Sequence, residues 1–141
     1  MADTPGEDRP TLRLVRSRDR NPDTAQTPGM VRSEAISGIT CGSEAIWMGE
    51  TRVAPGQRSA NHHHGHSETA IYVLSGHPVF VVGESGGERR LETSPGDYVY
   101  VPPFVPHREE NPSMDEEAVV VIARTTQEAI AVNLESLDEA T

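Results

Sequence analysis

Lysine is absent from this sequence, since all 12 of its basic residues are arginine. Schiff-base catalysis and a P-loop nucleotide site both require a lysine amine, so the sequence excludes both. Cysteine occurs once, at Cys41, which excludes an internal disulfide and a zinc site built from cysteine pairs. A single cysteine of this kind is typical of a small core or edge residue rather than a nucleophile.

Positive charge is also scarce, because 22 acidic residues against 12 arginines leave a formal net charge of -10. A surface this negative repels phosphate groups, which argues against nucleic acid and anionic membranes as partners. The longest apolar runs, such as residues 118–123, are far shorter than the roughly 20 residues of a membrane-spanning helix. The acidic, proline-containing start is unlike a secretory signal. We therefore expect a cytoplasmic protein.

The length of 141 residues fits a single domain. Residues 1–33 are rich in arginine, aspartate and proline, which predicts an N-terminal arm that is partly extended or disordered. Residues 34–135 are predicted to form the folded domain, and residues 136–141 an acidic, frayed tail.

Short β-branched and aromatic runs, separated by glycine and proline, fill the predicted domain, and no apolar period of 3.6 residues extends beyond two turns. We expect strands at residues 45–53, 59–64, 69–74, 79–82, 89–92, 97–101, 107–111, 118–125 and 129–134. Strands and turns at this spacing predict an all-β antiparallel sandwich or barrel.

Histidines form a distinctive cluster, because four of the six lie between positions 62 and 66. Side chains two residues apart in a strand lie on one face, so His62 and His64 can converge on one metal ion. His63 then points to the opposite face. The alternative is a solvated histidine-rich loop, since such tracts indicate metal binding only by composition.

A longer pattern surrounds this cluster: Gly56 is followed by five residues and His62-x-His64, and then by the segment 72–76, which ends in glycine. This pattern resembles the first conserved motif of the cupin superfamily. A downstream segment resembles the second cupin motif.

In that second segment Gly96 is followed by five residues and Pro102, and His107 by three residues and Asn111. Phe104 departs from the pattern, since the family usually has glycine there. Together the two motifs imply a double-stranded β-helix, or jelly-roll, barrel.

The resemblance implies that His62, His64 and His107 bind one divalent metal ion inside this barrel. Neutral imidazole ligands suit zinc, nickel or copper and leave the charge of the ion available as a Lewis acid. We favour zinc or nickel, with iron as the alternative, and expect no other cofactor.

The resemblance does not identify a fourth ligand, because Thr69 occupies the position of the family's usual carboxylate ligand. The adjacent Glu68 faces the other way in a regular strand, and it ligates only if the turn at Gly65 shifts the register. His66 shares the parity of the two motif histidines, so we predict it as the fourth ligand. The alternative for His66 is a surface position after a turn, and Glu68 is the predicted catalytic carboxylate.

Trp47, Tyr72 and Phe104 are the aromatic residues that we predict to line a cavity for a planar or polyketone substrate. Their alternative role is in the core, because aromatic side chains supply large buried area in any barrel.

Within the superfamily the sequence is similar to actinobacterial polyketide cyclases of cupin fold, of the resistomycin type. This resemblance implies aldol closure and dehydration of a poly-β-ketone in the biosynthesis of an aromatic antibiotic, a lyase-type reaction. The alternatives are a metal-dependent dioxygenase and a non-enzymatic small-molecule-binding protein, since one fold hosts many chemistries. Small cupins often pair through edge strands, so a homodimer is expected.

Overall fold

The structure is a computed structural model that describes residues 10–138, and these form ten β-strands with very little helix. The strands are β1 Met30–Ile36, β2 Trp47–Val53, β3 His62–His63, β4 Thr69–Ser75, β5 Val79–Glu84, β6 Gly87–Glu92, β7 Tyr98–Val101, β8 His107–Glu110, β9 Ala118–Arg124 and β10 Val132–Asn133. The helical elements are the 3-10 turn η1, Ser17–Asp19, and the single-turn helix α1, Gly38–Cys41.

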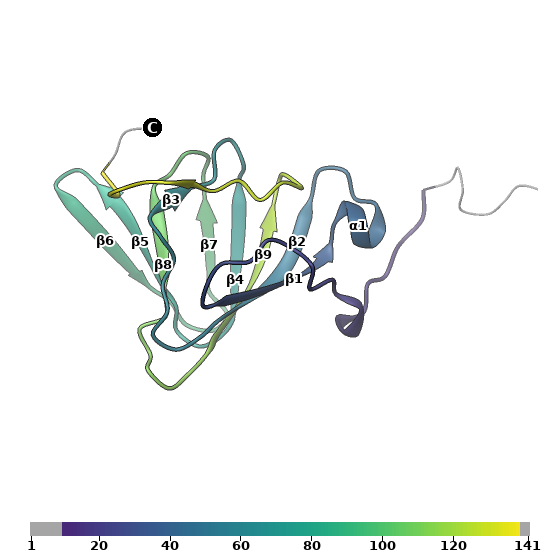
Figure 1. The fold of residues 1–141 in the computed structure, drawn as a ribbon, viewed down its shortest axis with the longest axis horizontal. Helices are drawn as coiled ribbons and strands as arrows, with labels where there is room; N and C mark the ends of the chain where they lie inside the picture. The colour runs from purple at the N-terminus through teal and green to yellow at the C-terminus, as the bar shows by residue number, and fades with distance from the viewer. Residues whose placement is uncertain (1–9, 139–141) are drawn as a thin grey trace, which may run out of the picture.

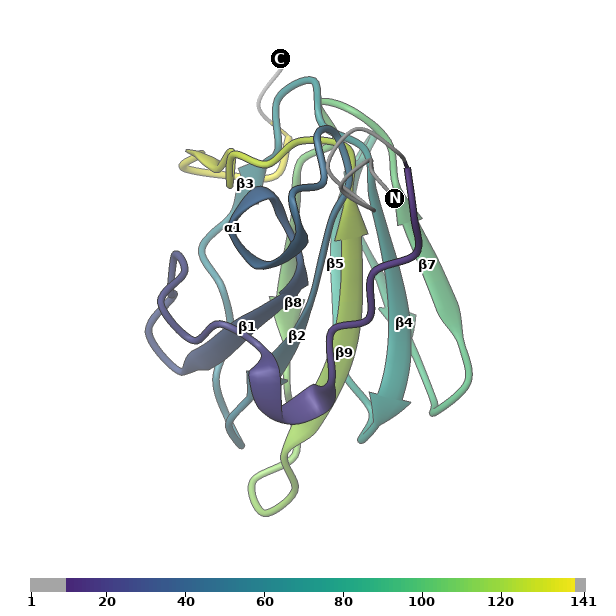
Figure 2. The same cartoon turned by 90° about the vertical axis from the view of Figure 1, so that its right-hand side faces the viewer.

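Two antiparallel sheets of five strands make up the fold (Figure 1). The first sheet has the order β1-β2-β9-β4-β7, and the second has the order β10-β3-β8-β5-β6. Figure 2 shows β9 and β4 side by side in the first sheet. From β6 to β10, successive strands alternate between the two sheets. The predicted all-β, double-stranded β-helix in a single domain is therefore confirmed.

The core lies between the sheets and follows the strand period of two. Ile71 and Val73 of β4 are buried, whereas residues between and beside them are more exposed. Ile71 pairs with Ile122 of β9, and Val73 with Val120, so both strands present apolar side chains to the same interior. Phe80 joins this cluster from the second sheet. Burying each such side chain stabilises the fold by about 1.5–3 kcal/mol.

Each strand range predicted within residues 34–135 overlaps an observed strand, from β2 to β10. The strand β1 was not predicted, because the polar residues Arg32, Ser33 and Glu34 occupy its middle and the burial of its residues does not alternate regularly. The predicted boundary between arm and domain, after residue 33, falls inside β1, so the end of the predicted arm belongs to the first sheet.

The predicted tail also contributes to the fold, since Leu137 is 3% exposed and packs with Val79 and Val81. The first part of the predicted arm, residues 1–9, and the last part of the predicted tail, residues 139–141, lie outside the described residues. In the part of the chain that is described, no helix has the length and apolar character to cross a bilayer.

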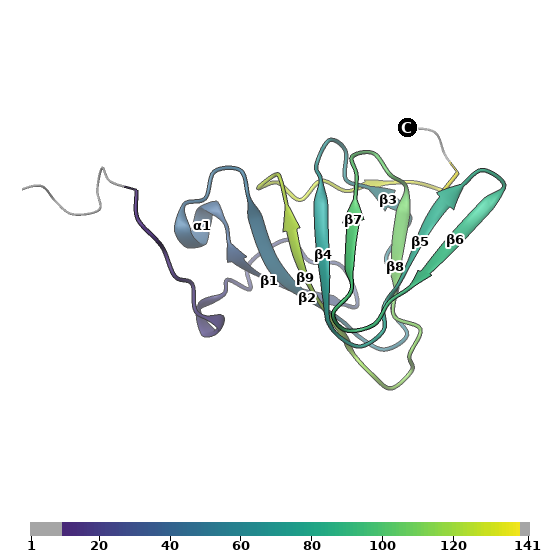
Figure 3. The same ribbon diagram turned by 180° about the vertical axis from the view of Figure 1, so that it is seen from behind.

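The segment after β9 crosses the ends of the strands (Figures 1 and 3). Its strand β10 pairs with β3, and the backbone N–H of Leu134 donates to the carbonyl of Asn61 at 2.8 Å. The segment before β1 is anchored by two backbone hydrogen bonds of 2.8 Å between Asn21 and Glu34. Both segments are thus attached to the sheets that they border.

A buried carboxylate of the first sheet joins the segment before β1 to β2 and to the residue that precedes α1. Glu34 on β1 is 4% exposed. It accepts hydrogen bonds from Asn21 Nδ2 at 2.8 Å, Trp47 Nε1 at 2.9 Å and Ser37 Oγ at 3.0 Å. Burial raises the pKa of Glu34, but the hydrogen bonds together outweigh burial and hold this pKa below its ordinary value of 4.5.

Acid is therefore expected to weaken the fold through Glu34. Because its pKa is lower in the folded than in the unfolded chain, its contribution is present above the unfolded-state pKa and is lost as the pH falls through the folded-state pKa. Glu34→Gln should lower the free energy of unfolding near neutral pH by about 1–3 kcal/mol. It should also reduce the further loss on acidification, as measured by urea unfolding.

The matched control is Glu117→Gln, since Glu117 is exposed and pairs with Arg52 on the surface. This control should have the same free energy of unfolding as the wild type at neutral pH and at acidic pH. If Glu34→Gln and the wild type lost equal stability on acidification, the assigned role of Glu34 would be wrong.

Candidate metal centre

Three histidines from the second sheet and the turn that follows β3 lie together. His62 of β3 pairs with His107 of β8, and His64 comes directly after β3. The ring centroids of His62 and His107 are 4.5 Å apart, and that of His64 lies 4.8 Å from His62 and 5.0 Å from His107. The potential ligand atoms of all three lie within 4.8 Å of one another, so one metal ion could bind all three.

Backbone carbonyls determine the tautomer of each ring. Every Nδ1 of the three lies 2.7–3.0 Å from a carbonyl oxygen, and because a carbonyl only accepts, each Nδ1 carries the proton. The carbonyls belong to Ala60 for His62, Ile130 for His64 and Val105 for His107. Each Nε2 therefore keeps its lone pair for a ligand.

The surroundings of the His107 Nε2 atom indicate whether a metal ion fits this site. It is buried and has no hydrogen-bond partner among the described residues. A buried acceptor without a partner is unfavourable, and ligation of a metal removes the penalty. Donation of the opposite ring N–H to a carbonyl is also the usual support of a metal-bound histidine. The residues present therefore fit a divalent metal ion.

The surroundings hold the rings of His64 and His107 in the neutral form. Burial lowers the pKa of His64 to about 4, and the neighbouring imidazoles add to this effect. Burial likewise lowers the pKa of His107, with His62 as the next cause. Since only the neutral imidazole binds metal, these rings are ready to ligate near neutral pH without first losing a proton.

No carboxylate belongs to this group of three among the described residues. Thr69 is buried and lines the adjoining cavity, at the start of the alternating pattern of β4. Glu68, predicted as the catalytic carboxylate, is exposed and accepts a hydrogen bond from the Tyr100 hydroxyl at 2.7 Å. The structure therefore differs from that prediction, because adjacent residues face opposite sides and Glu68 has the outer one.

His66, predicted as the fourth ligand, is exposed and lies outside the histidine group. The backbone N–H of Ser67 donates to the carbonyl of His64 at 3.1 Å, so His66 lies in a turn. The parity argument assumed an extended chain, and a turn breaks the alternation of faces. We do not retain His66 in the ligand set.

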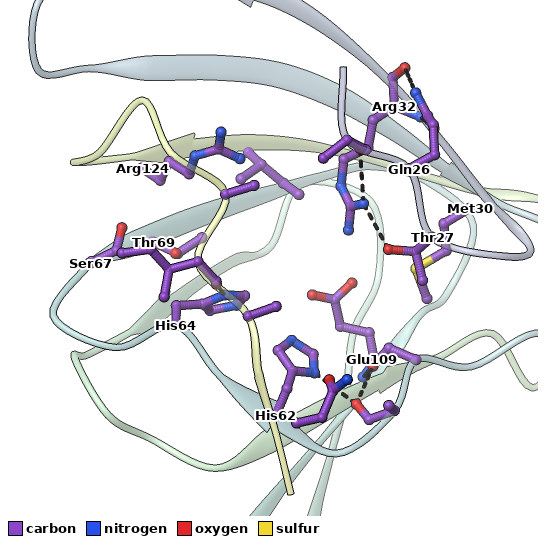
Figure 4. A pocket seen from close by; sticks show the side chains of 18 of the residues that line it. Gln26, Thr27, Met30, Arg32, His62, His64, Ser67, Thr69, Glu109 and Arg124 are labelled. Carbon is purple, nitrogen blue, oxygen red and sulfur yellow. Dashed lines mark hydrogen bonds between the residues drawn. The ribbon is translucent and has the colours of Figure 1, made fainter. Parts of the chain in front are cut away.

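A carboxylate that the sequence analysis missed faces the cavity. Glu109 of β8 is 8% exposed and follows His107 by two residues, which places both side chains on the same face of the strand. It lines the cavity together with His62 and His64 (Figure 4). The spacing His-x-Glu at positions 107–109 is the signal that could have identified it.

The cavity beside the histidines has a volume of about 520 Å³, within the size range of small-molecule sites. The second sheet contributes His62 and Glu109, and the first sheet contributes Arg32 (Figure 4). Residues 25–28, before β1, and residues 129–131, after β9, close other sides. The two chain segments that border the sheets therefore complete the cavity.

The three aromatic residues predicted to line this cavity lie elsewhere. Trp47 is 2% exposed in the core. Tyr72 occupies an outward position of β4 and packs against Tyr98, with 4.9 Å between ring centroids. Phe104 is 47% exposed and packs against His63. Its φ of 62° lies in the left-handed region that favours glycine, the residue that the motif usually has there.

Comparisons with known proteins agree with this fold. The solved structure of the polyketide cyclase RemF from Streptomyces resistomycificus is similar, with a TM-score of 0.74 and 21% identity over 91% of this chain and 89% of that chain. A variant of the oxalate decarboxylase OxdC from Bacillus subtilis has a TM-score of 0.66 and 25% identity, over 78% of this chain and 29% of that chain. KdgF from Halomonas sp. has a TM-score of 0.64 and 18% identity, over 84% and 96% of the two chains.

Sequence comparison leads to the same family. No curated protein sequence matches the chain. The family profile of the cupin domain, Cupin_2, matches residues 49–123, which is more than half of the chain and includes both histidine motifs. With the double-stranded β-helix and the three clustered histidines already in place, this match shows that the chain belongs to the cupin family.

Proposed function

We propose that this chain is a metal-dependent enzyme that closes a poly-β-ketone by an intramolecular aldol reaction followed by dehydration. The proposal depends above all on one observation, the three clustered imidazoles that each keep an unprotonated Nε2 beside a cavity. His62, His64 and His107 would hold the ion, and zinc or nickel suits these neutral nitrogen ligands. When bound, such an ion supplies Lewis acidity that stabilises negative charge on a carbonyl oxygen.

Glu109 is the acid–base group in this proposal. Aldol closure takes a proton from a carbon between two carbonyls and forms a bond from that carbon to another carbonyl carbon of the same chain. The Glu109 carboxylate faces the cavity and forms no ion pair or hydrogen bond with any described side chain, so it is free to accept this proton. Protonated Glu109 gives this proton to the alkoxide oxygen that the new carbon–carbon bond creates. It then removes the second proton from the same carbon and passes it to the hydroxyl, which leaves as water as the double bond forms.

The cavity positions the substrate. A flexible poly-β-ketone can close rings of several sizes, and a volume of about 520 Å³ holds a folded chain in few arrangements. Holding two reacting carbons together removes much of the entropic barrier to ring closure. The walls from both sheets and both bordering segments also limit access of water to the reacting groups.

The similar structures support a cyclase more than the alternatives. The likeness to the polyketide cyclase covers 91% and 89% of the two chains, whereas the oxalate decarboxylase is matched over only 29% of its length. The histidine group also lacks, among the described residues, the carboxylate of the usual iron dioxygenase triad. Iron in the purified protein, with oxygen uptake on a diketone, would instead support the dioxygenase.

Metal binding should depend on His107 and not on His66. His107→Ala removes one of three ligands, so we expect the affinity for zinc to fall at least about tenfold. Zinc content of the untagged protein by mass spectrometry, and equilibrium dialysis, measure this effect. His66→Ala is the matched control, because it removes an exposed histidine outside the group and should keep the wild-type zinc content. Loss of zinc in His66→Ala, or full retention in a folded His107→Ala, would refute this ligand set.

Turnover should depend on Glu109 and not on Glu68. Glu109→Gln keeps the shape of the side chain but removes the base, so we expect the rate of cyclisation to fall by about 10²–10⁴-fold. The substrate is a linear tetraketone whose closure and loss of water give an aromatic ring, followed by ultraviolet absorbance. Glu68→Gln alters the exposed carboxylate bound to Tyr100 and should keep the wild-type rate. Equal rates for the Glu109 variant and the wild type, at equal zinc content, would contradict the assigned role.

A further inference from the structure

The cavity beside the histidines is positively charged, although the chain as a whole is acidic. Its lining includes the arginines Arg32, Arg58 and Arg124 and one carboxylate, Glu109. Three positive charges against one negative charge leave a net charge of +2 with neutral histidines, in a chain whose formal net charge is -10. Composition does not account for this reversal of sign, which a bound anion would balance.

These three arginines also differ from others in their partners. Several arginines outside the cavity form ion pairs with glutamates, namely Arg20, Arg52, Arg89, Arg90 and Arg108. By contrast, no carboxylate of residues 10–138 lies within ion-pair distance of Arg32, Arg58 or Arg124. The cavity thus collects guanidinium groups that the protein itself leaves unpaired.

Arg124 is held rigidly beside the cavity. Its guanidinium stacks over the Trp47 ring, 3.9 Å from the centroid. Its Nε donates to the carbonyl of Thr126 at 2.9 Å and its Nη2 to that of Gln127 at 2.7 Å, while Nη1 has no partner among the described residues. Burial lowers the pKa of Arg124 to about 10, and the charge of Arg32 adds to this effect, whereas the charge of Glu34 opposes it. The two cations therefore destabilise each other unless an anion lies between them.

Arg32 lies on β1, in the same sheet as Arg124 on β9, and the strand β2 lies between these two strands. Its Nη1 donates to Thr27 Oγ1 at 2.9 Å, and its Nε and Nη2 have no partner among the described residues. Figure 4 shows its guanidinium pointing into the cavity, across from His62 and Glu109. Arg32 and Arg124 belong to the first sheet, whereas the strands of His62 and Glu109 belong to the second. A molecule between the sheets would contact cations on one side and the histidine site on the other.

We propose that the substrate carries a carboxylate that binds Arg32 and Arg124, while a carbonyl of the same molecule lies at the three histidines. Guanidinium groups bind carboxylates through paired, charge-assisted hydrogen bonds, and the unpartnered N–H groups supply the donors. This inference rests on the proposed function and narrows its substrate to a polyketo acid, in place of a neutral polyketone or ester. An enolate anion is the other source of anionic oxygen, and the test separates the two.

The test compares 3,5-dioxohexanoate with its methyl ester by titration calorimetry. Both compounds keep the acidic β-diketone, and only the acid has the carboxylate. The wild type should bind the acid about tenfold or more tightly than the ester, in both the zinc-loaded and the metal-free forms. Equal affinities for acid and ester in both forms would overturn the carboxylate site and leave only the enolate as the anionic group.

Arg32→Gln should remove most of the preference for the acid, and Arg89→Gln, which alters an exposed arginine paired with Glu84, should leave it unchanged. Arg124→Gln should act like Arg32→Gln, but it also removes packing on Trp47, so the Arg32 variant decides the matter. If Arg32→Gln kept the full preference, the proposed site would be wrong.

The two proposals fail in different ways. If zinc did not bind but the metal-free protein still preferred the acid, the proposed function would fail and the carboxylate site would be supported. If the protein cyclised the tetraketone but bound acid and ester equally, the carboxylate site alone would fail.

Discussion

The proposed metal centre of this protein depends on three hydrogen bonds between histidine Nδ1 atoms and backbone carbonyls. Each bond orients a ring and keeps the lone pair on Nε2, which an imidazole in the other tautomer would lack. The carbonyls come from residues 60, 105 and 130, which lie in three separate segments. The histidine site therefore forms only when these segments are in place, and the segment after β9 is as necessary as the two motifs.

The sandwich divides the chemistry of the cavity between its two sheets. The second sheet carries His62, His107 and Glu109, which are two of the proposed metal ligands and the proposed base. The first sheet carries Arg32 and Arg124, which are unpaired cations. Because alternate residues of each strand face inward, a single strand can present an apolar core and, near its end, a polar group to the cavity. The proposed catalytic groups and the proposed binding groups thus face each other without disturbing the packed interior.

Charge is also distributed differently outside and inside the cavity. Several acidic side chains pair with arginines outside the cavity, whereas the cavity keeps arginines without carboxylate partners. An acidic surface around a basic cavity repels anions at long range but binds them once inside, where charges are less screened. The arrangement favours a small anionic ligand over a large polyanion.

Local patterns in the sequence were sufficient to predict the strands β2 to β10 and the parity of His62 and His64, because alternation and turn residues act over a few positions. They failed for β1, whose Glu34 is buried by hydrogen bonds rather than by apolar contact. They also failed for His66, where a turn interrupts the alternation.

By itself, then, the sequence determined the fold class and the three clustered histidines, since spaced motifs and short-range periodicity specify both. Only the tertiary structure decided that Glu109 faces the cavity instead of Glu68, and that the aromatic candidates lie outside it. It also brought Arg32 and Arg124 into one cavity, because their strands are placed near each other by the sheet order β1-β2-β9. Such neighbours arise from long-range pairing, which no local pattern encodes.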